Sequence, residues 1–267
     1  MSGIPVCIDI SHHQGSVDWD QVAASGVKGV IHKATEGTSF RDDMRAENCS
    51  AAKQVGLGIS TYHWLSPGSE SNAADQMNFY LDTIQPVRGE RVVIDYEENG
   101  CDLGQLKAAV QALLDNGLDL KITVYSGHLL KEQLNGDCDS FLQQHTDLWL
   151  AQYTTGTPSW SQGTYDSWTL WQYSESGTIP GIDDAYVDLN NFNGSAEEFM
   201  AWISPAGEAP PIPVPPHPGD RLVDITVDAP EGVTVNVTVN GVTNTYRPKR
   251  RRHRWRRGPD IITRRRS

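Results

Sequence analysis

The 267-residue sequence has no stretch that approaches the roughly 20 consecutive apolar residues of a transmembrane helix. Residues 1–7 contain neither the basic leader nor the apolar core of a secretory signal peptide. These absences argue against an integral membrane protein. We therefore expect no transmembrane segment, synthesis in a cytoplasm, and action on any external target only after release by another route.

Cysteine is scarce, and its spacing argues against a metal centre. The four cysteines are widely separated and include no Cys-x-x-Cys pair: Cys7, Cys49, Cys101 and Cys138. We expect ordinary thiols rather than zinc ligands or a disulfide framework. His12 and His13 lie close to Asp9, but neighbouring side chains on a strand point in different directions, which disfavours joint metal binding. The sequence therefore predicts neither a metal nor a cofactor.

Positive charge is scarce everywhere except in the last residues. The net formal charge is −12, yet 11 of the 22 Lys and Arg residues fall within residues 247–267. Such a block is usually a solvated, disordered tail, or one that folds back on an acidic body. Anionic polymers or lipids are alternative partners. No folded reader motif accompanies the charge, so specific nucleic-acid binding is not expected.

Short β-rich apolar runs alternate with helical segments through the first two-thirds of the chain. Several runs are apolar at consecutive positions, which is typical of strands buried on both faces. The expected strands are 6–10, 28–34, 57–63, 91–96, 120–125, 148–153, 169–173 and 186–189, and the expected helices are 18–24, 42–55, 72–84, 103–114, 129–142 and 195–203. This order predicts an α/β fold, an irregular TIM-like barrel with five β/α units followed by three barer strands.

Composition divides the chain into four parts. A catalytic barrel is expected over residues 1–204, and seven prolines make 205–219 a stiff, extended linker. Residues 220–246 form a short β-rich extension, because valines alternate with polar residues around a hairpin signal at Asn240-Gly241. The basic residues 247–267 form the predicted disordered tail.

Acidic residues lie at or near the carboxyl ends of three expected strands. Asp9 follows Val6-Cys7-Ile8 in the first strand, Asp95 and Glu97 end the fourth, and Asp188 lies in the last. Carboxyl ends of parallel barrel strands open on one face, so we expect these residues to meet there. A lone Asp-x-Glu more often caps a helix or binds water. Together, however, one protonated carboxyl could donate to a glycosidic oxygen while the others stabilise positive charge on the sugar.

Aromatic residues follow the same strand ends, and their flat rings suit the apolar faces of sugars. They are Tyr62, Trp64, Tyr125, Tyr153, Trp171 and Tyr173. Any one of them could equally be a core residue, as we expect for Trp149 and Trp202. Lys33 and Glu36 could hydrogen-bond sugar or peptide groups, or simply form a surface ion pair.

At these residues the sequence resembles glycoside hydrolase family 25, the Ch-type lysozymes found among phage endolysins and bacterial autolysins. The resemblance covers roughly residues 4–203, and its short blocks occur in the family's order. The blocks are Asp9-Ile10-Ser11-His12-His13-Gln14-Gly15, Lys33-Ala34-Thr35-Glu36-Gly37, Tyr62-His63, Asp95-Tyr96-Glu97, Val124-Tyr125-Ser126, Leu148-Trp149-Leu150-Ala151-Gln152-Tyr153, Leu170-Trp171-Gln172-Tyr173-Ser174 and Val187-Asp188-Leu189-Asn190.

The resemblance implies hydrolysis of the β-1,4 bond between N-acetylmuramic acid and N-acetylglucosamine in peptidoglycan. It makes Glu97 the proton donor and Asp95 the second catalytic carboxylate, with Asp9 and Asp188 completing the acidic floor. It also implies retention of anomeric configuration, and leaves open whether a carboxylate or the substrate's acetamido oxygen attacks. The substrate-binding residues expected here are Lys33, Tyr62, Trp64, Tyr125, Gln152 and Trp171.

The implied role is that of a phage or prophage endolysin in host lysis, with peptidoglycan glycan strands as partner and the basic tail adhering to anionic envelope polymers. Two other interpretations compete with this one. A chitinase-like barrel also ends its fourth strand with Asp-x-Glu, but usually has further Asp residues at the positions that Val93 and Arg91 occupy. A non-catalytic barrel could bind wall glycans through its aromatic groove, although an intact Asp95/Glu97 pair disfavours this.

Overall fold

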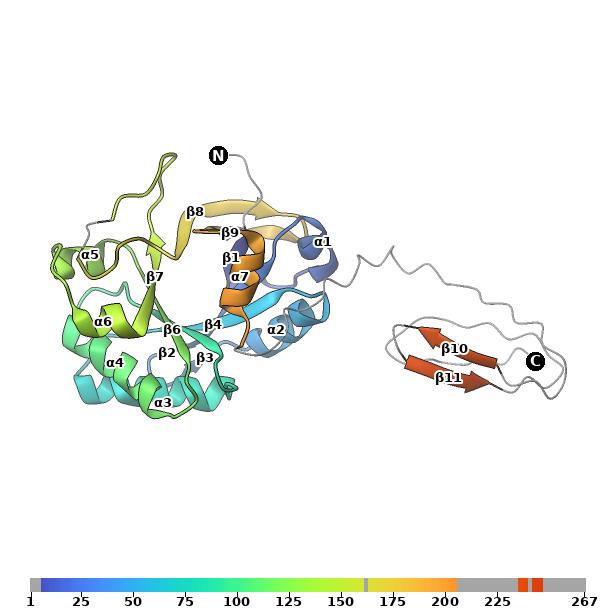
Figure 1. The fold of residues 1–267 in the computed structure, drawn as a ribbon, viewed down its shortest axis with the longest axis horizontal. Coiled ribbons are helices and arrows are strands. Elements are labelled where there is room, and N and C mark those ends of the chain that lie inside the picture. The colour runs from blue at the N-terminus through green and yellow to red at the C-terminus, as the bar shows by residue number, and fades with distance from the viewer. Residues whose placement is uncertain (1–5, 161–162, 206–234, 240–241, 247–267) are drawn as a thin grey trace. The chain divides into compact units, whose positions relative to one another are not determined.

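Eight strands close into a barrel in the computed structural model, which describes residues 6–160, 163–205, 235–239 and 242–246 (Figure 1). Around the barrel, the strands follow the order β1 (Cys7–Ile10), β9 (Ile182–Phe192), β8 (Leu170–Ile179), β7 (Thr146–Ala151), β6 (Lys121–Ser126), β5 (Arg91–Asp95), β4 (Gly58–Trp64) and β2 (Gly29–Glu36). Pairing of β1 with β2 completes the ring. The short β3 (Phe40–Arg41) pairs with the end of β2. The predicted α/β barrel is confirmed.

The last barrel strand departs from the expectation that all strands are parallel. β9 runs antiparallel to both β8 and β1. Only Pro180 and Gly181 separate β8 from β9, a connection too short for the helical crossover that parallel strands need. The assumption that Asp188 ends a parallel strand was therefore wrong. Asp188 lies within an antiparallel strand, where its Cα is paired with that of Asp9.

Helices cover the outside of the barrel, and most begin at a side-chain cap. They are η1 (His12–Gln14), α1 (Trp19–Ala24), α2 (Arg45–Gln54), α3 (Glu70–Ile84), α4 (Leu103–Asp115), α5 (His128–Leu134), α6 (Ser140–His145) and α7 (Ala196–Ile203). The single helix expected over residues 129–142 was wrong. Asn135 adopts a left-handed conformation that ends α5, and the Asp139 side chain caps a new helix, α6.

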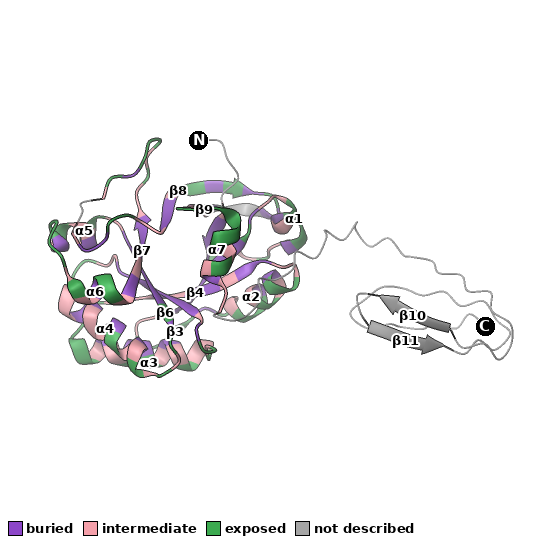
Figure 2. Ribbon diagram, viewed as in Figure 1, coloured by how far each residue is buried: buried purple, intermediate pink, exposed green. Residues whose placement is uncertain are grey.

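The buried side chains lie mainly on the strands and on the helix faces that pack against them (Figure 2). Helix α7 packs at the amino-terminal ends of β2 and β4, where Phe199 and Ile203 are fully buried. A Cβ at Gly29 would lie 2.8 Å from the Phe199 ring, and one at Gly58 would lie 2.4 Å from Ile203. Only glycine permits this close approach, so these two strand starts are adapted to hold α7.

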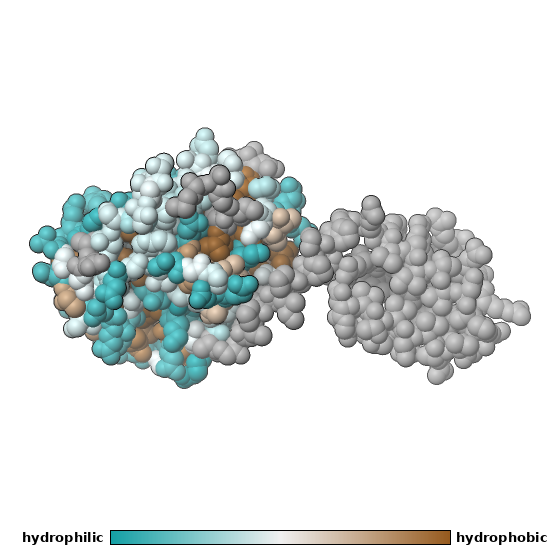
Figure 3. Space-filling view, turned by 45° about the horizontal axis from the view of Figure 1, so that its top comes forward, coloured by the Kyte–Doolittle hydropathy of each residue, from teal (hydrophilic) through white to brown (hydrophobic). Residues whose placement is uncertain are grey.

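The chain divides into two units, residues 1–216 and 217–267. In the second unit, β10 (Val235–Val239) and β11 (Val242–Tyr246) pair antiparallel. The Asn240-Gly241 turn, most of the 205–219 linker and the basic tail lie outside the described residues. In the described part of the chain, no helix has the length and apolar character required to traverse a bilayer. On the face shown in Figure 3, hydrophobic residues appear only in patches between polar ones.

Candidate active site

Four carboxyl groups line a single cavity of about 110 Å³. The cavity lies where the carboxyl ends of β4, β5 and β6 meet β1, β8 and β9. Its complete lining is Asp9, Tyr62, Trp64, Asp95, Glu97, Tyr125, Trp149, Gln172 and Asp188. The structure thus brings together the four acidic residues that the sequence pattern selected.

The backbone around Tyr96 sets the positions of Asp95 and Glu97. Asp95 is the last residue of β5, and Glu97 follows two residues later. Between them, Tyr96 is fully buried and donates its hydroxyl hydrogen to Gln133 Oε1 at 2.6 Å. Its amide donates to the Tyr125 carbonyl oxygen at 2.8 Å, so the extended pairing with β6 continues past the end of β5. Because alternate residues of extended chain share a face, Asp95 and Glu97 both line the cavity.

Burial and like charges increase the proton affinity of Asp95 and Glu97. Burial raises the pKa of Asp95 well above its usual value, and the charge of Glu97 adds to this effect, whereas Lys33 opposes it. Burial also raises the pKa of Glu97, with a further increase from Asp188. One Asp95 oxygen, Oδ1, is buried and has no hydrogen-bond partner within the described residues. The pair therefore offers one carboxyl that retains a proton and one oxygen that is available to a ligand.

Asp9 and Asp188 form the second acidic pair. Gln172 Nε2 lies 3.1 Å from each carboxylate oxygen of Asp9, and Asn190 Nδ2 donates to Asp9 Oδ2 at 2.7 Å. Burial and the charge of Asp188 raise the pKa of Asp9, while these amide hydrogen bonds lower it. Burial also raises the pKa of Asp188; the hydrogen bond with Asp9 opposes this increase, and the charge of Glu175 adds to it.

Three of the predicted aromatic residues line the acidic cavity. These are Tyr62, Trp64 and Tyr125. Burial raises the pKa of Tyr62 and Tyr125 well above the usual value, and nearby carboxylates raise it further, so both phenols are neutral hydrogen-bond donors. The Trp64 indole is held by a 2.8 Å hydrogen bond from Nε1 to Glu98. Trp149 was expected to be a core residue, and it is buried, with 1% of its surface exposed. It also lines the cavity.

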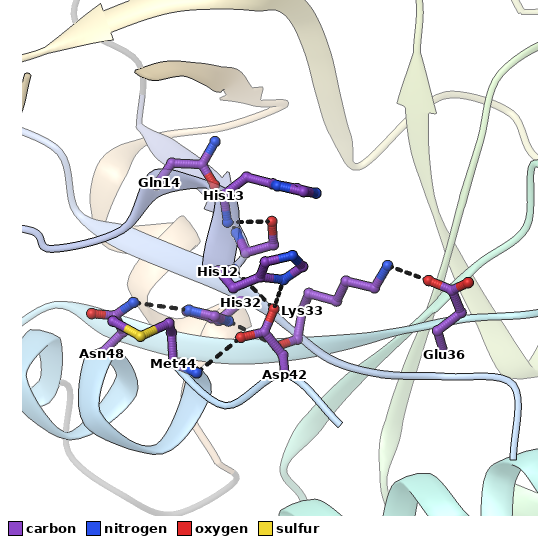
Figure 4. A network of polar contacts seen from close by, with 10 residues as sticks. His12, His13, Gln14, His32, Lys33, Glu36, Asp42, Met44 and Asn48 are labelled. Atoms are coloured by element: carbon purple, nitrogen blue, oxygen red, sulfur yellow. Dashed lines mark hydrogen bonds and ion pairs between the residues drawn. The ribbon is translucent and has the colours of Figure 1, made fainter. Parts of the chain in front are cut away.

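Lys33 borders the cavity but is not part of its lining. Its ammonium group lies 5.1 Å from the centre of the Trp64 ring and 5.4 Å from that of Phe40, and it forms a 2.6 Å ion pair with Glu36 (Figure 4). The intramolecular ion pair that the sequence left open is therefore present. Lys33 also lowers the proton affinity of both Asp95 and Glu97.

Figure 4 shows a polar network beside Lys33 that holds the segment after β1. The buried Asp42 carboxylate accepts from the backbone N–H of His12 and contacts His12 Nδ1, both at 2.9 Å. It also accepts from the Met44 amide at 3.1 Å. Although burial raises the pKa of Asp42, these hydrogen bonds outweigh it and the pKa is lowered. Asp42 therefore fixes the chain just after Asp9.

Gln152 and Trp171 lie away from the carboxyl groups. Trp171 lines a different cavity of about 480 Å³, together with Trp168 and Phe192. Its indole Nε1 donates to the Gln152 carbonyl oxygen at 2.7 Å, and the Gln152 side chain accepts from the Ser159 amide at 2.8 Å. Neighbouring residues of a strand point to opposite faces. Gln172 faces the barrel interior, so Trp171 faces outward.

Sequence reasoning missed Gln172 and Asn190, the two amides that contact Asp9. Both lie within motif blocks in which the sequence analysis selected a neighbouring residue instead, Trp171 or Asp188. A polar residue inside an otherwise apolar strand was the available signal, because a buried amide requires hydrogen-bond partners. As for metals, no cluster of three or more His, Cys, Asp or Glu side chains suited to hold an ion occurs among the described residues.

Comparison with known proteins gives consistent similarities. The family model described as Glycosyl hydrolases family 25 matches residues 8–182. Lysozyme M1 of Streptomyces globisporus is 28% identical over 207 residues, which cover 73% of this chain and 69% of that protein. The bacterial lysozyme structure from Streptomyces coelicolor shares the fold, with a TM-score of 0.65 and 24% identity over 76% of this chain and 98% of that one. The CTP1L endolysin structure gives a TM-score of 0.62 and 26% identity over 74% of this chain and 68% of that one.

Proposed function

This chain belongs to glycosyl hydrolases family 25, and we propose that it is an N-acetylmuramidase that cleaves the β-1,4 bond from N-acetylmuramic acid to N-acetylglucosamine in peptidoglycan. The observation that carries the proposal is the convergence of Asp9, Asp95, Glu97 and Asp188 in one cavity. The 28% identity to a protein named lysozyme supports the choice of bond.

Glu97 is the group best suited to donate the proton. Burial and the charge of Asp188 raise its pKa, so a protonated fraction persists closer to neutral pH than for an ordinary glutamic acid. In the proposed reaction Glu97 gives this proton to the bridging oxygen as the bond to the sugar's anomeric carbon breaks. A water molecule then supplies hydroxyl to that carbon and returns a proton to the Glu97 carboxylate.

The remaining carboxyl groups stabilise the positive charge that develops on the sugar. Asp95 is buried beside Glu97, and its unpartnered Oδ1 is free to accept a hydrogen bond from the substrate or to face the charged ring. Asp9 lines the same cavity. Tyr62, Trp64 and Tyr125 provide apolar ring surface and hydroxyl groups for the sugar. Charge stabilisation by preorganised groups in a partly buried site is stronger than in water.

Analysis of the products tests the proposed function directly. Purified peptidoglycan is digested with the protein, and the soluble fragments are reduced and examined by mass spectrometry. Fragments with muramic acid at the reducing end support the proposal. Fragments with glucosamine at the reducing end, or cleavage of chitin oligomers in preference to peptidoglycan, would overturn it in favour of a glucosaminidase or a chitinase-like enzyme.

We also propose that the enzyme acts as a phage or prophage endolysin in host lysis, after synthesis in the host cytoplasm. The similarity to the CTP1L endolysin supports this role. Expression in a bacterial cytoplasm should be harmless until the membrane is permeabilised, and should then cause rapid loss of turbidity. Lysis without permeabilisation, or none after it, would contradict this role while leaving the bond specificity untouched.

For residues 247–267 we propose adhesion to anionic envelope polymers, on the basis of 11 Lys and Arg residues in this stretch. Retention on cell walls should then fall steeply between low and high salt, because such attraction is screened. A chain ending at residue 246 should show weaker and less salt-dependent retention. Equal retention of both forms would refute this function of the tail.

A further inference from the structure

Two side-chain amides contact the buried Asp9 carboxylate. Gln172 Nε2 lies 3.1 Å from both of its oxygens, and Asn190 Nδ2 lies 2.7 Å from Oδ2. All of these contacts come from N–H donors. Asp188, its partner across the strand pair, receives no N–H donor from the described residues. Donors of this kind favour the charged form of the carboxyl group that they contact.

The orientation of the Asn190 amide is fixed by Trp149. Asn190 Oδ1 accepts a hydrogen bond from the indole Nε1 of Trp149 at 2.7 Å. An indole N–H only donates, so the oxygen of Asn190 must face Trp149 and the nitrogen must face Asp9. Turning the amide over would set two donors against each other and two acceptors against each other, with all four groups buried.

Gln172 is held between Asp9 and two tyrosines. The hydroxyl groups of Tyr125 and Tyr153 both donate to Gln172 Oε1, at 2.8 and 2.9 Å. With its oxygen occupied by two donors, Gln172 presents its nitrogen to Asp9. The reversed amide would place its oxygen against the two carboxylate oxygens of Asp9, a high cost for buried polar groups.

We propose that Gln172 and Asn190 act as positioning residues, an amide clamp that orients the Asp9 carboxylate and favours its ionised form against burial and the neighbouring Asp188. This inference rests on the proposed glycosidase function. The clamp favours a negative charge on Asp9 in the cavity that Glu97 also lines, so the acid catalyst and the charge-stabilising group can differ in protonation state. Two carboxyl groups with different environments divide acid and anion roles in this manner.

Two substitutions of Gln172 separate the clamp from a purely structural role. Gln172→Met removes the donors, so Asp9 takes up a proton more readily and the acid limb of the kcat/KM profile moves up by about one pH unit. Gln172→Glu keeps the shape. Its protonated carboxyl still donates to Asp9 at low pH, but its ionised form repels Asp9. The alkaline limb should therefore move to lower pH while the acid limb stays close to that of the parent enzyme.

Gln21 provides a matched control, because its Nε2 also donates to a carboxylate, that of Asp18, at 2.8 Å on the exposed surface. Gln21→Glu should leave both limbs unchanged. If instead the two Gln172 variants lower activity equally at every pH, the clamp is only structural and the proposal fails. Limb shifts in opposite senses support it.

A titration without substrate keeps the clamp testable if Gln172 variants lose activity. Aspartate labelled with ¹³C at the side-chain carboxyl is followed by NMR from pH 3 to 8, with the Asp9 signal assigned by its loss in Asp9→Asn. The proposal requires the Asp9 titration to move to higher pH in Gln172→Met and in Asn190→Leu. An Asp9 titration that is unchanged, or that moves to lower pH, in both variants would overturn it. If the parent enzyme releases no reducing ends from peptidoglycan, the proposed function fails, and this titration still judges the clamp.

Discussion

Asp9 on β1 and Asp188 on β9 are direct Cα partners in the antiparallel pairing that closes the barrel. Two carboxyl groups opposite each other on neighbouring strands repel when both are ionised. Burial raises the pKa of both groups, and the charge of Asp188 raises that of Asp9 further. The barrel is thus closed by a pair of residues that weakens it, which is the expected compromise when an acidic site is built into a fold.

Removing one of these charges should stabilise the protein at neutral pH. Both groups bind protons more tightly in the folded state than in the unfolded state, so they favour folding only when protonated and lose that contribution as pH rises through the folded-state pKa. Asp188→Asn should therefore raise Tm at pH 7, by about 2 to 4 °C for each kcal/mol gained in a body of this size. Calorimetry at pH 7 and pH 3.5 measures the difference.

The gain should vanish near pH 3.5, below the unfolded aspartic acid pKa of about 3.9. Asp166→Asn, at an exposed position, provides the control and should leave Tm unchanged at both pH values. An Asp188→Asn variant that is less stable than the parent protein at pH 7 would contradict a repulsive pair.

Glu97→Gln should abolish hydrolysis without unfolding the protein. The amide fills the same volume but has no proton to give to the glycosidic oxygen. General acid catalysis contributes about 10²–10⁴-fold, so release of reducing ends should fall by that factor or more. Reducing-end release and circular dichroism would be measured on the same preparation.

Glu132→Gln is a suitable control, because Glu132 is exposed on α5 and does not line the cavity. It should retain full activity. A Glu97→Gln variant that keeps more than about a tenth of the parent activity would be incompatible with Glu97 as the proton donor.

Sequence alone predicted those features of the fold and site that follow from periodicity and strand order. Consecutive apolar residues before Asp9 and Asp95 marked buried parallel strands, and barrel closure placed both residues on one face. The antiparallel course of β9 was not predictable from residues 186–189, because a run of four residues carries no information on strand direction. The actual strand starts at Ile182, directly after the turn at Pro180–Gly181.

The direction of the side chains on β8 also could not be predicted from the sequence. Trp171 and Gln172 are both buried, so the alternation that distinguishes inner from outer positions on half-buried strands is absent here. Trp171 was predicted to bind substrate, but Gln172 is the residue that faces the acidic cavity. By contrast, the break between α5 and α6 had a readable signal, since Asn135 and Gly136 form a common helix stop.

Arg91 should be essential for stability at the end of the barrel where α7 packs. Its buried guanidinium donates to the Trp202 carbonyl oxygen, Thr123 Oγ1 and Asp147 Oδ2 at 2.7 to 2.8 Å, and lies 3.9 Å from the centre of the Trp202 ring. Burial lowers its pKa to about 10, so it remains charged at neutral pH. Arg91→Met should reduce the free energy of unfolding by about 3 kcal/mol, because the buried Thr123 and the partly buried Trp202 carbonyl and Asp147 lose their donor.

Urea unfolding measures this change, and Arg88 offers the matched comparison. Arg88 pairs with Asp119 where both side chains are largely exposed, and exposed ion pairs contribute little. Arg88→Met should leave the urea midpoint almost unchanged. Equal effects of the two substitutions would mean that the contacts of Arg91 with α7 do not stabilise the barrel.

His63 should make the protein less stable as the solution is acidified. The imidazole is fully buried on β4, where Nδ1 contacts Thr35 Oγ1 at 2.7 Å and Nε2 contacts Gln76 Oε1 at 3.1 Å. Because Gln76 Oε1 also accepts from the Ser66 amide, it is an acceptor for His63 as well, and the neutral ring is fully satisfied. Burial lowers the pKa of His63 to about 4.

The unfolded chain binds a proton at His63 near pH 6.5, whereas the folded protein resists it until about pH 4. Stability from this residue is therefore complete above pH 6.5 and declines by up to about 1.4 kcal/mol per pH unit as the pH falls toward 4. His63→Gln keeps one donor and one acceptor but cannot titrate. Its deficit relative to the parent protein should shrink steadily between pH 6.5 and 4 in urea unfolding, while His145→Gln, at a half-exposed position, should show no such trend. A deficit that stays constant across this range would show that His63 does not contribute to the acid sensitivity of the barrel.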